Sequence, residues 1–202
     1  MVYVAIICLP YTRLNMSLAP VDYDFGIPAN YAFAENITCS NDEAKKMYVE
    51  AFGHMLNYNH EQAIACFTKC AELDPNCAMA WWGIAYCLSS SYNWSAGLGP
   101  GYDAISQAVS LKDHCSELEQ DLIMALSKRH TKEARDNANP AALNMGNSPE
   151  LNQAFAEAMA PLYEKYSGNL DVTAIYVEAL MNLNPWTLWN KDTASGEITP
   201  VD

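Results

Sequence analysis

Residues 63–86, AIACFTKCAELDPNCAMAWWGIAY, decide the fold that the sequence predicts. Up to Ala71, apolar side chains recur at the three- and four-residue spacing that places them on one face of a helix. Asp74-Pro75 ends this helix, because proline lacks an amide hydrogen and disfavours helical geometry in the residue before it. A second apolar face then begins at Trp81. The stretch therefore predicts the second helix of one hairpin followed by the first helix of the next.

Ala63, Phe67 and Pro75 match the second helix of the tetratricopeptide repeat (TPR), and the stretch resembles that family. The TPR unit is a helix pair of about 34 residues, so counting back one period from Trp81 gives a first repeat over about residues 42–75. The chain is also similar to the N-terminal part of larger, mostly bacterial TPR proteins. The resemblance implies an all-α fold in which antiparallel helical hairpins stack as a TPR-like right-handed solenoid with irregular insertions.

The chain is predicted to have an extended N-terminal arm over residues 1–41, TPR-like helical repeats over 42–183 and a C-terminal tail over 184–202. The arm is rich in Pro, Asn and Asp and has no helical period. Glycines and prolines predict two long insertions, at 89–101 and 129–149. Seven helices are expected, over residues 42–58, 60–73, 77–90, 102–111, 117–128, 149–166 and 170–183.

The charge of the chain limits its partners. The 202 residues carry a formal net charge of −13, and half of them are hydrophobic. A nucleic acid or an anionic membrane would need a basic face, so the composition favours a protein or peptide partner, possibly basic. The apolar run at residues 2–9 is too short to span a bilayer and lacks a basic leader. We therefore expect a cytoplasmic protein with no membrane span.

The seven cysteines are an odd number, and most of them lie within apolar helical patterns. Cys66 and Cys70 are one helical turn apart, but no second CxxC or histidine pair completes a metal site. Reduced cysteine behaves as a small hydrophobic residue when buried. The sequence therefore predicts that the thiols pack in the core and that the protein holds neither metal nor cofactor.

Catalytic motifs are absent from the sequence, which contains no GxGxxG, GxxxxGK[ST], HExxH or GxSxG. His54 and His60 could pair as acid and base, but His60 stands in the phrase YNHEQA and is expected at a turn or helix start. The first hypothesis is a noncatalytic scaffold that binds a peptide or protein in a concave groove. The alternative is the N-terminal helical part of a larger enzyme or enzyme subunit, with catalytic residues beyond this chain.

The groove of a TPR array is lined by the first helix of each repeat. Setting the phase of these helices by Ala51 and Ala85 predicts a stripe of partner-binding side chains rich in aromatic rings, which often anchor peptides. The stripe consists of Tyr48, Phe52, Met55, Met79, Trp82 and Tyr86. Two interpretations stay open here. The stripe forms an open groove, or it is covered by the arm, by the 89–101 insertion or by further repeats.

Overall fold

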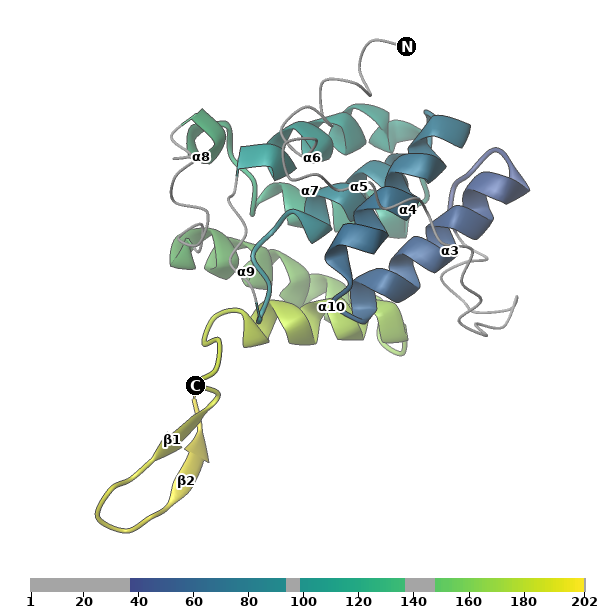
Figure 1. Cartoon of the computed structure of the whole chain (residues 1–202). Coiled ribbons are helices and arrows are strands. Elements are labelled where there is room, and N and C mark those ends of the chain that lie inside the picture. The colour runs from purple at the N-terminus through teal and green to yellow at the C-terminus, as the bar shows by residue number, and fades with distance from the viewer. Residues whose placement is uncertain (1–36, 94–98, 137–147, 202) are drawn as a thin grey trace.

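The computed structural model describes residues 37–93, 99–136 and 148–201 (Figure 1). Within these residues the protein is mostly helical, as the sequence predicts. The α-helices are α3 (Asp42–Leu56), α4 (His60–Leu73), α5 (Ala78–Cys87), α6 (Gly99–Leu111), α7 (Glu117–Ser127), α8 (Lys132–Asp136), α9 (Pro149–Lys165) and α10 (Leu170–Met181), with the short 3₁₀ helix η2 at Lys112–His114. Each predicted helix has an observed counterpart.

Helix starts follow local sequence signals. Asn41 caps α3 by accepting a hydrogen bond from the amide of Ala44, as a short polar side chain does at an N-cap. Ser116 and Glu119 form a reciprocal capping box at the start of α7, satisfying amides that have no partner within the helix. Asn169 accepts from two amides at the start of α10. Short-range chemistry therefore sets these helix boundaries.

Helices that are neighbours in sequence pack on one another. Contacts join α3 to α4, α4 to α5, α5 to α6, α6 to α7, and α9 to α10. The α9–α10 hairpin is joined to the earlier helices through α7, and Figure 1 shows it lying across one side of them. The apolar core runs through all of these helices and is continuous from Ala44 to Ala179.

Three details differ from the prediction. Helix α6 begins at Gly99, although the glycines and proline there were expected to prevent a helix. Proline is tolerated in a first helical turn, because the amide it lacks has no partner there. Gly101 is needed for a different reason, since a Cβ atom at this position would lie 2.2 Å from the His130 ring. The connection after α7 contains α8. Residues 94–98 and 137–147 of the two insertions lie outside the described residues.

The C-terminal tail contains a short hairpin, so the fold is not purely α-helical. Strands β1 (Trp189–Lys191) and β2 (Ile198–Pro200) pair antiparallel, with Asn190 opposite Thr199. Asp192 stabilises the turn by accepting hydrogen bonds from the amides of Ala194 and Ser195. Figure 1 shows the hairpin extending away from the helices.

The predicted arm is described only from Ile37 onward, and residues 1–36 lie outside the described residues. Thr38 donates two hydrogen bonds to the Glu119 carboxylate at the start of α7, 2.7 and 2.6 Å long. The Ser40 amide donates to Asp74, just after α4. This end of the arm therefore lies against the helices, and it contacts two of them. Among the described residues, no helix combines the length and apolar character needed to cross a membrane.

Candidate functional site

All six predicted partner-binding residues are buried, so the expectation that they line an open groove is wrong for this structure. The set comprises Tyr48, Phe52, Met55, Met79, Trp82 and Tyr86, each with at most 4% of its surface exposed. The Trp82 indole donates to the carbonyl oxygen of Leu122 in α7, and the Tyr86 hydroxyl donates to Glu178 in α10. Within the described residues, α7 and α10 thus cover the part of the stripe that lies on α5.

The other half of the stripe is buried within the first hairpin. The Tyr48 ring lies 5.4 Å from that of Phe67 in α4, centroid to centroid, in a tilted arrangement. Phe52 stacks beside Tyr48. An aromatic stripe at helical spacing is usually a core feature, and this one follows that rule. Both halves of the stripe therefore belong to the core.

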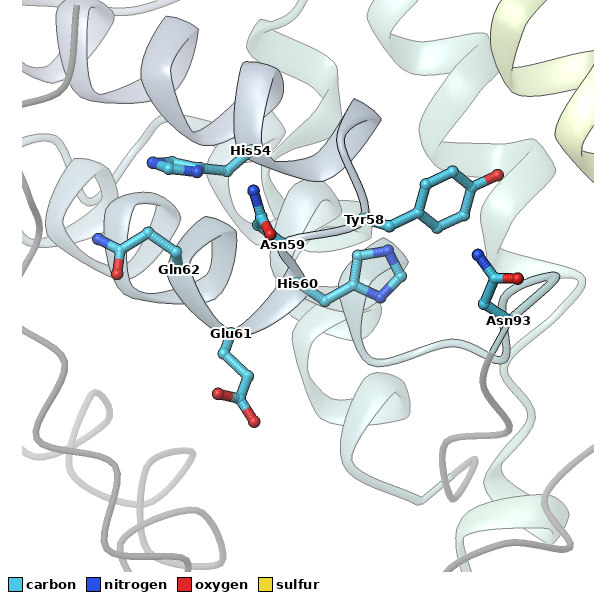
Figure 2. Close-up of a pocket in the computed structure, with 7 residues that line it drawn as sticks. All are labelled: His54, Tyr58, Asn59, His60, Glu61, Gln62 and Asn93. Atoms are coloured by element: carbon cyan, nitrogen blue, oxygen red, sulfur yellow. The ribbon is translucent and has the colours of Figure 1, made fainter.

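A pocket of about 500 Å³ lies at the turn between α3 and α4 (Figure 2). We call it the turn pocket and define it by its lining residues, His54, Tyr58, Asn59, His60, Glu61, Gln62 and Asn93. Figure 2 shows Tyr58 and His60 extending toward Asn93, with His54 and Gln62 on the other side of Asn59. A volume of this size falls in the range of small-molecule or side-chain binding pockets.

The backbone at the turn pocket adopts an uncommon conformation. Tyr58 has a φ of 59°, in the left-handed region that bulky side chains rarely enter. Its amide donates to the carbonyl of Met55, and the Asn59 amide donates to that of His54, so the end of α3 fixes this geometry. Residues held in sparsely populated conformations tend to cluster at functional sites. The turn thus aims the Tyr58 ring at the pocket at the cost of local strain.

The second non-glycine residue with positive φ in the described chain, Trp186 (φ 65°), lies close to the same place. Its ring stacks on Tyr92, 5.2 Å away between centroids, and Tyr92 precedes the pocket residue Asn93. Both unusual aromatic residues therefore lie at or beside the turn pocket. The positive φ of both residues supports the turn pocket as the candidate site.

The described residues that line the pocket all carry polar groups, and none of them is a lysine or arginine. Burial lowers the pKa values of His54 and His60, which favours their neutral form at pH 7. The Nε2 atom of His60 is buried without a hydrogen-bond partner in the structure. Glu61 adds an exposed carboxylate. Such a site offers hydrogen-bond acceptors and a negative charge, and it suits a cation with several donors.

Sequence analysis found only part of this site. His60 is the first residue of α4, as expected, but it also lines the pocket. His54 was considered only as a possible partner of His60, and Asn93 was placed in an insertion. The signal that could have indicated the pocket is the cluster of asparagines and histidines around the left-handed residue Tyr58. The approach of Asn93 depends on long-range packing that no local pattern reveals.

The outer face of α10 is a second unusual surface. Leu170, Ala174, Val177 and Leu180 follow one another at helical spacing and are all exposed. The opposite side of α10 is buried, so the helix is apolar on both faces. A helix that is apolar all round is normally buried on all sides.

Comparisons of the whole chain with family models, curated proteins and solved structures found no match.

Proposed function

We propose that the protein is a noncatalytic binding module with a TPR-like array of helical hairpins, and that it recognises a basic peptide or protein. In this proposal the turn pocket holds one arginine or lysine side chain of the partner. The supporting observation is the composition of the described lining, which combines the Glu61 carboxylate with neutral imidazoles and carboxamides and includes no Lys or Arg. The net charge of −13 favours the approach of a basic partner.

Five of the seven lining residues have a role in this proposal. Glu61 pairs with the cation, and charge-assisted hydrogen bonds of this kind are stronger than neutral ones. The side-chain oxygens of Asn59 and Asn93 accept further N–H groups. The His60 ring is buried, with its Nε2 out of reach of a ligand, and it supports Tyr58 by stacking against its ring. The face of Tyr58 is available to a guanidinium plane through a cation–π contact.

The proposal can be tested by varying one position of the ligand. Labelled peptides of neutral composition would carry arginine, lysine, citrulline or glutamate at the centre, and their binding would be followed by fluorescence anisotropy. Citrulline keeps the shape of arginine without its charge. Loss of a charge-assisted bond should weaken binding by about tenfold or more. We expect arginine and lysine peptides to bind, with an affinity that falls as salt rises.

Two results would contradict the proposal. One is a citrulline peptide that binds as tightly as the arginine peptide, since the cation would then be irrelevant. The other is the absence of binding for every peptide of the panel, which would leave the turn pocket without this ligand class.

The outer face of α10 favours a second candidate function. We propose as the alternative that these helices are the N-terminal helical part of a larger enzyme or enzyme subunit, in which a further helix covers Leu170, Val177 and Leu180. The supporting observation is that these side chains are exposed at helical spacing on a helix whose other face is already buried. Replacing Val177 and Leu180 with lysine and measuring the binding of a hydrophobic dye tests whether this face is an apolar surface open to another helix.

A further inference from the structure

Cys39, which is distant in sequence, meets Cys70 and Cys77 at the junction between α4 and α5. Cys39 precedes α3, Cys70 lies in the last turn of α4 and Cys77 is the N-cap residue of α5. Their three sulfur atoms all lie within 4.8 Å of one another. The Cys70 thiol donates to the Cys77 sulfur across 3.9 Å. Cys70 and Cys77 are fully buried, whereas Cys39 is half-buried and leaves the cluster accessible from one side.

We propose that Cys39, Cys70 and Cys77 form a binding site for a thiophilic divalent cation, with zinc as the metal that fits best. Zinc binds cysteine sulfur at about 2.3 Å with tetrahedral geometry, which places two ligand sulfurs about 3.8 Å apart. The Cys70–Cys77 separation of 3.9 Å already matches that spacing. The cluster as a whole needs a contraction of at most about 1 Å to reach it.

The surroundings hold the three ligands in place. The Ser40 amide donates to one oxygen of Asp74 at 2.5 Å, and the Asn76 amide donates to the other at 3.1 Å. The Asn41 side chain donates to the carbonyl of Leu73. These bonds attach the segment that carries Cys39 to the turn between Cys70 and Cys77. Hydrogen bonds around a site commonly orient metal ligands in this way.

Asp74 is the side chain placed to supply a fourth ligand. The Asp74 carboxylate lies beside the Cys39 thiol and is within hydrogen-bonding reach of it. A carboxylate oxygen or a water molecule can complete a tetrahedral zinc site that has three protein thiolates. On binding, each coordinating thiol loses its proton to solvent and the metal takes its place as the partner of sulfur. The bound ion would then join the arm, α4 and α5.

The test uses the full chain, kept reduced and stripped of metal with a chelator, and titrated with Co²⁺. Cobalt bound by thiolates in a tetrahedral site gives a sulfur-to-metal charge-transfer absorption, whose intensity reports the number of thiolates. We expect one Co²⁺ per chain with three thiolates, displaced by an equivalent of Zn²⁺. The Cys39→Ser and Cys77→Ser variants should weaken metal binding by at least about tenfold.

Cys66→Ser is the matched control, because Cys66 is a buried thiol of α4 outside the cluster. It should bind Co²⁺ like the parent. Because Cys77 is fully buried, circular dichroism would verify that its variant is folded, and the half-buried Cys39 gives the same test with less disturbance of the core. The proposal is overturned if no charge-transfer band appears, if Cys39→Ser keeps both the full band intensity and the affinity of the parent, or if Cys70 and Cys77 form a disulfide and no metal is taken up.

Discussion

The indole nitrogen of Trp82 donates a hydrogen bond to the carbonyl oxygen of Leu122 across 3.1 Å, joining α5 to α7. Both ends of the bond are buried. Trp82 therefore contributes to the core in two ways, through the apolar area of its ring and through a satisfied polar atom. This relationship makes it a structural residue rather than an anchor for a peptide in a groove.

The first prediction follows from that burial. Trp82→Ala should lower the free energy of unfolding by about 3–5 kcal/mol, because it removes a large buried ring and leaves a cavity. Urea denaturation would measure this change. Trp189→Ala is the control, since Trp189 is 64% exposed and its truncation should change stability by less than about 0.5 kcal/mol. A Trp82→Ala protein as stable as the parent would mean that the ring is not part of the core.

A second prediction concerns the closest approach of α5 to α4. A Cβ atom at Gly83 would lie 2.4–2.5 Å from three ring atoms of Phe67, and that ring is fully buried. Alanine favours a helix by up to about 1 kcal/mol relative to glycine. The overlap should outweigh this gain, so we expect Gly83→Ala to destabilise the protein by about 1–3 kcal/mol. Thermal or urea unfolding would show the change.

Phe67→Leu provides the control for the Gly83 prediction. If the ring causes the clash, the double variant should lose less stability than the sum of the two single changes, because residues in contact are not additive. Additive losses would show that Gly83 is required for some other reason.

A third prediction concerns pH and the turn pocket. Burial lowers the pKa of His60, as it does that of His54, so both rings gain protons only below the ordinary value of 6.5. Protonation places positive charge beside Tyr58 and Glu61, which are the other titratable groups of the pocket. Affinity for an arginine peptide should therefore hold as pH falls to about 6.5 and decrease below it, in a range where ordinary carboxyl groups stay ionised down to about pH 5.

The His60→Asn and His54→Asn double variant should flatten this pH dependence, measured by anisotropy at constant salt. His114→Asn is the matched control, since His114 is exposed in η2, away from the pocket lining. The same pKa shifts predict that the parent loses stability as pH falls from the ordinary value of 6.5 towards the lowered values, because the unfolded chain binds those protons first. An affinity that rises on acidification would contradict the cation assignment.

A fourth prediction addresses the outer face of α10. Substituting lysine for Val177 and Leu180, which are 47% and 42% exposed, should reduce the fluorescence of a hydrophobic dye bound to the protein without unfolding it. Met124→Lys, on α7, is the control because Met124 is 41% exposed but lies on a different surface. Dye binding that is unchanged in the α10 variant would remove the argument that this face is available to another helix.

Local sequence predicted the helices well because their ends depend on local chemistry. The range 60–73 matches α4, and the helix expected over 170–183 begins where α10 does, after the cap Asn169. Helix α6 begins three residues earlier than expected. Glycine disfavours a helix, but a first helical turn tolerates the proline that follows Gly99. The β1–β2 hairpin depends on pairing between two strands, and the polar composition of the tail gives no local signal of that pairing.

The candidate sites could be predicted less well, because they depend on contacts between distant segments. The stripe that includes Trp82 was found correctly as a helical face, but the sequence could not show that α7 would cover it. His60 was placed correctly at the start of α4, while its proximity to Asn93 comes from tertiary packing. The meeting of Cys39 with Cys77 has the same origin, since 38 positions separate them in sequence.

The most direct measurement of the central proposal compares two variants that change the net charge equally. Glu61→Gln removes the carboxylate of the turn pocket, and Glu43→Gln removes an exposed one in the first turn of α3. Isothermal titration calorimetry with an arginine peptide would give the affinity of each. We predict that Glu61→Gln weakens binding by about tenfold or more while Glu43→Gln stays close to the parent. Equal losses in the two variants would show that only the overall charge attracts the peptide, and would contradict a specific cation site in the turn pocket.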